Sequence, residues 1–222
     1  KEPLSENRDA EIESPVIAND LSNQKVTAIA EDTQGHIWIG TFRGLNKNNV
    51  HDYHQYFCTD DSLGLPDNQI THLLRDSKNR FWVGTVNGVC LYTDKDNFRI
   101  IPIEADNKNV RQILEDRNGR IFLNTGFQLY AYHPREEKIT CVLPEISPGN
   151  AFYAQCHIAP DNNLWVMTST GLRCYDPSTL QLKESVALSG YPYYSYLHNN
   201  ELWITGNHTL SIFDTRTRSF KP

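Results

Sequence analysis

"DTQGHIWIGTFRGL", residues 32–45, places a tryptophan in a short apolar run, followed by a Gly-Thr pair and then a Gly-Leu pair. A related phrase, "DSKNRFWVGTVNGV", occupies residues 76–89. Three weaker copies follow, with the cores "RIFLNT", "NLWVMT" and "ELWITG". The five copies are centred on Trp38, Trp82, Phe122, Trp165 and Trp203, at spacings of 44, 40, 43 and 38 residues. A unit of about 40 residues repeated along a chain indicates a solenoid or a propeller.

Each copy divides into four strand-like runs separated by turn residues. In the first copy the runs are "VTAIAED", "HIWIGT", "GLNKNN" and "HDYHQYFC". In copies one to three the first turn combines Asp, which accepts bonds from the backbone ahead, with Gly or Asn, which tolerates positive φ. In copies four and five we expect a shorter type I′ turn, at Asn162-Asn163 and Asn199-Asn200. Four antiparallel strands per copy predict an all-β chain, a β-propeller with five visible four-stranded blades over residues 20–222.

The aromatic row has a structural explanation. A four-stranded blade is apolar on both faces, so each blade needs a wide side chain where it meets its neighbour. We therefore assign Trp38, Trp82, Phe122, Trp165 and Trp203 to contacts between blades. Two residues later, Gly40 and Gly84 are expected to let the adjacent blade approach closely, whereas Asn124, Met167 and Thr205 at that position predict different packing.

Composition limits the classes of function. The 222 residues include 39% hydrophobic side chains, enough for a sizeable core, and contain no run of eighteen apolar residues. The formal charge is −6, and residues 1–20 hold six acids against Lys1 and Arg8. An acidic N-terminal segment (residues 1–19) thus precedes a nearly neutral body with no basic stripe for nucleic acid. We expect this segment either to add a strand to a ring-closing blade or to remain disordered.

The sequence predicts no metal or cofactor site. Five cysteines, at positions 58, 90, 141, 156 and 174, lack the spacing of metal ligands, and their odd number cannot form a complete disulfide framework. We therefore expect free thiols. His51 and His54 would need a helix to share a metal ion, and the residues around them favour a strand.

The expected binding face is built from two sets of loops. With the first strand of each blade innermost, the segments that join successive blades and the turns between strands two and three open on the same face. The residues at the tips of these loops differ from copy to copy, although the flanking strand residues repeat. Variable loop tips on a constant scaffold are typical of ligand-binding surfaces. The candidate ligand-binding residues are Arg43, Asn87, Phe127, Thr170, His208 and Tyr193. Arg43 suits the carboxylate or sulfate of an acidic sugar, Asn87 suits hydroxyl groups, and Phe127 or Tyr193 suits stacking on a pyranose ring.

Residues 65–92, "LPDNQITHLLRDSKNRFWVGTVNGVCLY", resemble the two-component-regulator propeller repeat. Copies one and two share its Asn, its Asp, the Trp-Ile/Val-Gly-Thr element and the Gly-Leu/Val element, whereas copies three to five lose the Gly-Thr or the Asp turn. Such repeats are found in the periplasmic sensor regions of hybrid two-component systems, especially those of gut Bacteroidetes. Those regions recognise glycans, regulate polysaccharide utilisation, and form seven-bladed propellers ahead of an immunoglobulin-like domain, a membrane helix and a histidine kinase.

The resemblance implies a role for the whole chain. It implies the N-terminal part of a periplasmic sensor region that binds an oligosaccharide without a cofactor or catalysis of its own, and reaches the membrane only through a downstream segment. Five blades of a seven-bladed design have the wrong wedge angle for closure, so we expect an open arc. Its partner is then a second copy, either through self-association of the open ends or in a sensor dimer.

Two other functions remain open at this stage. A protein-interaction scaffold would use the same fold. A propeller lyase or glycosidase would need acidic or histidine side chains on the axial face, for which Glu31, His72 and His208 are the candidates. A glycan-binding screen combined with a turnover assay distinguishes these functions from a sensor.

Overall fold

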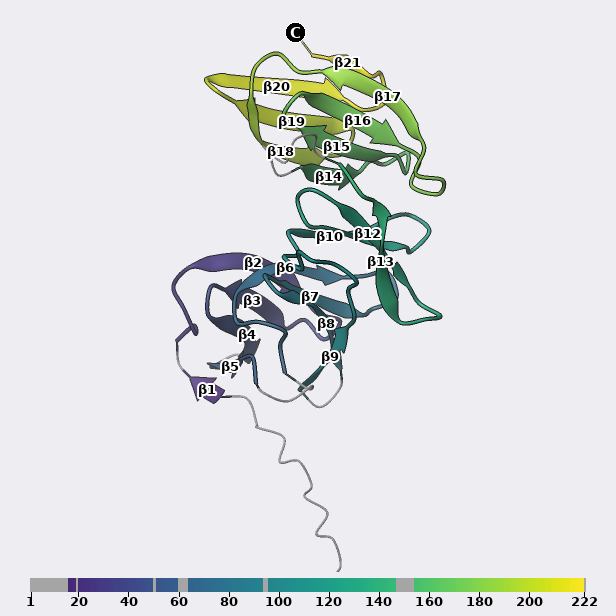
Figure 1. Ribbon diagram of the computed structural model, residues 1–222. Coiled ribbons are helices and arrows are strands. Elements are labelled where there is room, and N and C mark those ends of the chain that lie inside the picture. Colours follow the sequence, from purple (N-terminus) through teal and green to yellow (C-terminus); the bar gives the residue numbers. More distant parts are fainter. Residues whose placement is uncertain are drawn as a thin grey trace, which may run out of the picture.

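The computed structural model describes residues 16–18, 20–49, 51–59, 64–93, 96–146 and 154–221. These residues form strands, turns and connecting segments without a helix, and the strands assemble into five antiparallel sheets. The sheets are the five blades that the repeat predicts, so the all-β propeller fold is confirmed. In Figure 1 the blades follow one another in chain order around a C-shaped arc, with the first and fifth blades at its two ends.

Four strands in chain order build each blade. Blade one contains β2 (Val26–Glu31), β3 (Ile37–Thr41), β4 (Gly44–Asn49) and β5 (Asp52–Tyr56). Blade two contains β6 (Ile70–Arg75), β7 (Phe81–Thr85), β8 (Gly88–Thr93) and β9 (Asn97–Ile101). Blade three contains β10 (Gln112–Glu115), β11 (Ile121–Asn124), β12 (Leu129–His133) and β13 (Lys138–Leu143). Blade four contains β14 (Gln155–Ile158), β15 (Leu164–Thr168), β16 (Gly171–Tyr175) and β17 (Leu182–Ala187). Blade five contains β18 (Pro192–His198), β19 (Glu201–Gly206), β20 (Thr209–Asp214) and β21 (Ser219–Phe220).

Blade one has a fifth strand, β1 (Val16–Ala18), which pairs antiparallel with β5. The described residues of the N-terminal segment, Val16–Ala18, therefore extend the first blade and do not complete a ring-closing blade. Between β1 and β2, the Ser22 amide donates to Asn46 Oδ1 (2.8 Å), and Asn46 Nδ2 donates to Ser22 Oγ (2.8 Å). These bonds satisfy the fully buried Asn46 side chain. The rest of the acidic segment, residues 1–15 and 19, lies outside the described residues.

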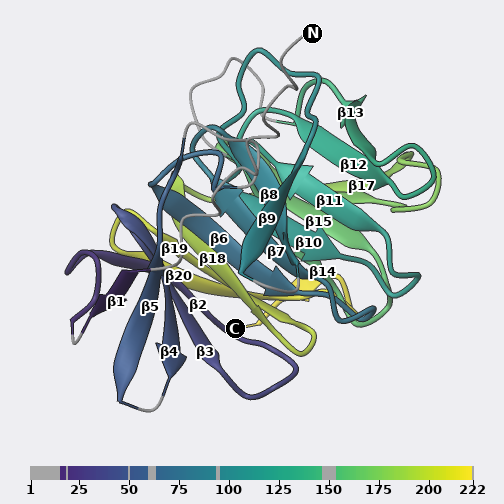
Figure 2. The ribbon, with the colours of Figure 1, turned by 90° about the horizontal axis from the view of Figure 1, so that it is seen from below.

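The first strand of each blade lies on the concave side of the arc. Contacts between neighbouring blades run from β2 to β6, from β6 to β10, from β10 to β14 and from β14 to β18. Seen from below, blade five lies behind the nearer blades, which agrees with its place at the far end of the arc (Figure 2). The expected binding face requires the first strand of each blade to be innermost, and these contacts between first strands have that arrangement.

The aromatic residues of the first four copies pack against the blade that follows them. The Trp38 ring lies 5.0 Å from that of Phe81, and the Trp82 ring 4.9 Å from that of Tyr132. The Trp165 ring lies 5.0 Å from that of Phe213. These three tryptophans are 0% exposed and Phe122 is 1% exposed. Trp203 is 36% exposed, because no blade among the described residues covers that side of blade five.

Two glycines bring the first three blades close together. A Cβ atom on Gly40 would lie 2.5 Å from Ile70 Cγ2, and one on Gly84 would lie 3.0 Å from Val110 Cγ1. In the third copy Asn124 takes this place and donates from Nδ2 to the Ala154 carbonyl (2.8 Å). At this position a glycine therefore allows close packing between blades one, two and three, whereas an asparagine forms a hydrogen bond between blades three and four.

The first turn of blade four is not shortened, so that prediction was wrong. The Ala159 amide donates to the Asn163 carbonyl (2.9 Å), and the Asn162 amide donates to the Ala159 carbonyl (2.8 Å), the same pattern as in blade one. Asp161 Oδ1 supports the longer turn by accepting from the Asn163 amide (3.0 Å). Blade five does have a two-residue turn, but of its two asparagines only Asn199 has a positive φ (53°), so it is not type I′.

Candidate functional site

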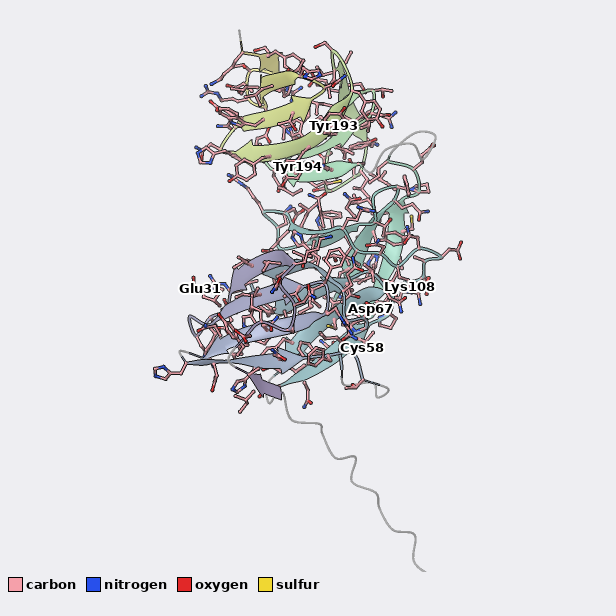
Figure 3. All side chains as sticks on the ribbon, turned by 90° about the vertical axis from the view of Figure 1, so that its left-hand side faces the viewer. Glu31, Cys58, Asp67, Lys108, Tyr193 and Tyr194 are labelled. Carbon is pink, nitrogen blue, oxygen red and sulfur yellow. The ribbon has the colours of Figure 1, made fainter. Side chains whose placement is uncertain are left out.

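The turns between strands two and three lie beside the segments that join successive blades. The Gly44 amide donates to the Asn68 carbonyl (2.7 Å), and the Ala154 amide donates to the Gly126 carbonyl (2.7 Å). We call this side of the blades the joining face. In Figure 3, Asp67 and Lys108 come from two such joining segments and lie on one side of the ribbon, whereas Glu31, at the end of β2, lies on the other.

A threonine at the end of the second strand builds these turns. Thr41 Oγ1 donates to the Gly44 carbonyl (2.8 Å) and accepts from the Arg43 amide (3.1 Å). The same pair of bonds recurs at Thr85 and Thr168. Because these bonds fix the backbone of the turn, the residue at its third position projects from a rigid frame.

Four candidate residues occupy that third position on separate turns. Arg43, Asn87 and Thr170 are exposed, and His208 is exposed with a φ of 60°. Among the described residues, no hydrogen bond or ion pair joins one of these four side chains to another. The structure thus places them on one face but as four separate tips.

The two aromatic candidates differ in exposure. Phe127 is half-buried, and its carbonyl accepts from the Ile146 amide (2.8 Å). Tyr193 is 56% exposed at a bulge in β18, with its ring 6.1 Å from that of Tyr191. Tyr193 is therefore the better placed of the two to stack on a ligand (Figure 3).

Sequence reasoning missed two glutamines that bridge the inner strands. Gln112 Oε1 accepts from the Cys156 amide (2.9 Å), and Gln112 Nε2 donates to the Cys156 carbonyl (3.2 Å). Gln155 Oε1 accepts from the Ser195 amide (2.7 Å). The two glutamines hold the same place in consecutive copies, 43 residues apart, and this recurrence is the signal that identifies them.

Two partly buried histidines lie in the same region. Burial lowers the pKa of His72 to about 4, although a hydrogen bond to the backbone of Ile113 opposes the shift. Burial also lowers the pKa of His157 to about 4. Its Nε2 lies 2.8 Å from Oγ of Ser195, which is 2% exposed and also contacts Gln155 Oε1 (3.0 Å). This Ser-His contact stabilises the packing of blades four and five and is closed to a substrate.

The enzyme candidates do not converge among the described residues. Glu31 and His208 are exposed on blades one and five, whereas His72 points between blades two and three. No three His, Cys, Asp or Glu side chains in the described part of the chain lie close enough together to hold a metal ion. No disulfide joins the five cysteines, all of which lie in the described ranges, and Cys58 and Cys141 are exposed. Within the described ranges no helix is long and apolar enough to span a membrane.

Two segments, residues 20–43 and 64–87, match the family described as the two component regulator propeller. They include the first two Trp strands and the Asp turns that precede them. The chain carries two-component-regulator propeller repeats. No curated protein matches the sequence as a whole.

Solved structures share the fold of these repeats. The extracellular domain of a protein described as a hybrid two component system from Bacteroides thetaiotaomicron is 15% identical, with a TM-score of 0.53 over 89% of this chain and 36% of that chain. A second such domain from that organism is 18% identical, with a TM-score of 0.52 over 93% of this chain and 36% of that chain. Virginiamycin B lyase from Staphylococcus aureus is 17% identical, with a TM-score of 0.70 over 93% of this chain and 72% of that chain. At these identities the likeness shows the propeller fold, and the chain spans 36% of the length of the two extracellular domains.

Proposed function

We propose that the chain is a non-catalytic, ligand-sensing part of an extracytoplasmic two-component receptor, and that its ligand is a glycan. The observation that carries the proposal is the joining face, where a repeated threonine frame holds exposed tips of different chemistry. Arg43, Asn87 and Tyr193 there supply a cation, an amide and an aromatic ring. These are the groups that recognise an acidic, hydroxyl-rich ring.

The family repeats and the structural neighbours support the signalling part of the proposal. Repeats of this kind are described as belonging to two-component regulators, and two neighbours are extracellular domains of hybrid systems. In the whole protein, ligand binding in the periplasm would then control a histidine kinase and, through it, genes for polysaccharide utilisation.

Calorimetric screening of neutral and acidic oligosaccharides tests the ligand class. We expect an acidic oligosaccharide to bind, and Arg43→Ala to weaken it about tenfold because a charge-assisted hydrogen bond is lost. Arg117→Ala is the matched control, since Arg117 is an exposed arginine on the turn between β10 and β11, away from the joining face. Equal effects of the two variants, or no binding by any oligosaccharide, would contradict the proposal.

The lyase neighbour justifies one further measurement. Virginiamycin B lyase shares the fold with a TM-score of 0.70, so each bound oligosaccharide is also assayed for turnover. We expect none, because Glu31, His72 and His208 lie on three different blades. Turnover that is lost on His72→Gln would favour a propeller enzyme, and binding to proteins but not to glycans would favour the scaffold.

A further inference from the structure

On the side opposite the joining face, the first turns of blades one to three each contact the blade that follows. Between blades two and three the groove beside this contact is filled by Arg80, whose Nε donates to Asp76 Oδ2 (2.6 Å). Its guanidinium lies 5.1 Å from the ring centroid of Trp82 and 5.3 Å from that of Tyr132. A planar guanidinium between two aromatic rings and a carboxylate closes the groove.

The groove between blades three and four is filled in the same way. Arg120 Nε donates to Asp116 Oδ2 (2.8 Å), and its guanidinium lies 5.6 Å from the ring centroid of Phe122. Arg120 Nη2 also donates to Ser178 Oγ of blade four (3.1 Å). An arginine four residues after the turn aspartate is therefore the filling residue in both grooves.

Blade one has His36 at this place, and its groove stays open. His36 Nδ1 remains beside its own turn, 3.1 Å from Asp32 Oδ2. A lysine from the third strand replaces the missing guanidinium: Lys47 Nζ lies 5.2 Å from the Trp38 ring centroid and 5.4 Å from that of Tyr92. The corresponding residues of blades two and three are Leu91 and Ala131, so the histidine and the lysine are a paired departure from the repeat.

This exchange leaves a cavity of about 320 Å³ between blades one and two. Its lining includes Lys47 and Arg75, the amides Gln34 and Asn79, and the ring of Tyr92. The volume exceeds that of an inorganic anion and lies at the lower end of the range for small-molecule sites.

The two carboxylates of the cavity already have donors. Asp32 accepts from Trp38 Nε1 (2.9 Å) and from the backbone amides of Gln34 and His36. Asp96 accepts from the hydroxyl groups of Tyr56 (2.7 Å) and Tyr92 (2.8 Å). Burial alone would raise the pKa of Asp96, but these hydrogen bonds and the charge of Lys47 hold it below its usual value.

The two cations, by contrast, have donors to spare. Lys47 Nζ contacts Tyr92 Oη at 3.5 Å, and Arg75 Nη1 donates to the Asp32 carbonyl (3.0 Å). Neither forms an ion pair with a carboxylate in the described part of the chain. Their remaining N–H groups would satisfy an anionic group better than a neutral one.

We propose that this cavity binds an acidic monosaccharide unit, with its anionic group between Lys47 and Arg75 and its hydroxyl groups toward Gln34 and Asn79. The site lies across the blades from the joining face, so it is separate from the glycan contact proposed above. The aromatic ring of Tyr92 and the two amides favour a hydroxyl-rich ring over a bare anion, because amides both donate to and accept from hydroxyl groups.

Ligand-observed NMR and calorimetry with glucuronate, glucose and inorganic sulfate test the site on the full 222-residue chain. We expect glucuronate to bind about tenfold or more tightly than glucose, and the binding to weaken as salt is added. Lys47→Met keeps the length of the side chain and removes its charge, and should weaken glucuronate binding about tenfold. Sulfate that binds as tightly as glucuronate, or equal binding of glucose and glucuronate, overturns the acidic-sugar assignment.

A second variant controls for folding. His36→Arg combined with Lys47→Leu reproduces the pair found in blade two, where Arg80 and Leu91 coexist in a filled groove. We expect this variant to unfold at the same or a higher urea concentration than the unmodified chain and to lose glucuronate binding. Arg43→Ala should leave glucuronate binding at this groove unchanged, which separates a failure here from a failure of the joining face. Glucuronate binding that is retained when Arg43→Ala is added to the filled-groove variant, or that is lost completely on Arg43→Ala alone, overturns the site.

Discussion

At the scale of single residues, the aspartate of the first turn anchors the tryptophan of the next strand. Nε1 of Trp38 donates to Asp32 Oδ2 (2.9 Å), and Nε1 of Trp82 donates to Asp76 Oδ2 (2.8 Å). In blade four an alanine, Ala159, stands six residues before the tryptophan, and Trp165 Nε1 is buried without an acceptor. An unpaired buried donor costs about 1–3 kcal/mol, so blade four carries a local defect that blades one and two lack.

Ala159→Asp should repair this defect. The turn has the same backbone hydrogen bonds as the turn of blade one, so a carboxylate at this position can reach Trp165 Nε1. We expect the free energy of unfolding to rise by about 1 kcal/mol, less than a full hydrogen bond because a carboxylate is also desolvated. Urea unfolding measures the change. In a Trp165→Phe background the gain should vanish, and a gain that persists there would refute the repaired hydrogen bond.

The first turn also shows where residue-level prediction succeeds and fails. The Asp and Trp of copies one and two stand at a fixed spacing, and the structure explains it by a direct hydrogen bond. In copy four Ala159 stands in place of this Asp, and the pair Asn162-Asn163 predicts a shorter turn because Asn-Asn suits a two-residue hairpin loop. Asp161 instead keeps the turn at its full length through its bond to the Asn163 amide. Which of several turn residues accepts that bond depends on the folded backbone, which the sequence pattern does not specify.

At the scale of the blade, stacking is directional. In blades one to four the aromatic residue of the repeat is buried by the blade that follows it, whereas in blade five it is not, so the burial of this position depends on its place in the arc. Trp82 is 0% exposed between blades two and three, and Trp203 is 36% exposed on blade five.

Trp82→Ala and Trp203→Ala form a matched pair for this directionality. We expect Trp82→Ala to lower the free energy of unfolding by about 3–5 kcal/mol, because it leaves a cavity between two blades. Trp203→Ala should cost about 1 kcal/mol, since its ring is already partly in solvent. Urea unfolding at low protein concentration measures both. Equal losses would mean that the position does not act through contact with the following blade.

The contacts between inner strands predict a dependence on pH. Burial lowers the pKa of His72 and of His157 from 6.5 to about 4, so the unfolded chain binds protons between these values that the folded chain does not. Stability is therefore full above about pH 6.5 and falls as the pH drops toward 4. Because both rings keep some contact with solvent, we expect a loss of about 1–2 kcal/mol for each.

Replacing both histidines with the corresponding residues of copy three tests this dependence. Copy three has Gln112 where copy two has His72, and Leu114 where copy four has His157. The double variant His72→Gln, His157→Leu should lose less stability than the unmodified chain between pH 7 and about pH 5, as measured by urea unfolding. Other groups that titrate contribute equally to both proteins. Identical losses would contradict buried, neutral histidines.

The fold was more predictable at this scale than the site. Alternating apolar runs and turn residues specify four strands per copy, and these are the observed blades. The cavity beside Lys47 was missed, because it results from two departures on different strands, His36 and Lys47, whose effects meet only when neighbouring blades pack. A lone lysine in a column otherwise filled by Leu91, Ala131, Cys174 and Ile212 is the sequence signal that points to it.

At the scale of the whole molecule, the arc has two unequal ends. Most exposed large apolar side chains lie on the first and last blades, and Ile100 and Leu182 are the exceptions. On blade one, Ile29 is 67% and Ile37 39% exposed, although the corresponding residues of blade two, Leu73 and Phe81, are buried against blade one. On blade five, Tyr194, Tyr196, Trp203 and Leu210 are among the exposed residues. Blade one thus exposes the kind of face that packs against a tryptophan of the preceding blade, and blade five exposes such a tryptophan, Trp203.

These complementary ends predict that the 222-residue chain self-associates head to tail. The contact would repeat the one between neighbouring blades, with Trp203 of one copy against Ile29 and Ile37 of the next, and exposed apolar faces of this kind drive association. At about 100 μM a weak interface of standard size is populated, so light scattering at that concentration should give a mass above that of one chain.

Two sets of changes test which surface forms the contact. Trp203→Ser combined with Leu210→Ser should shift the chain toward monomer. Ile100→Ser, which removes an exposed apolar residue from blade two, should not. A strictly monomeric unmodified chain, or an equal response to the two sets of changes, would show that the ends do not pair.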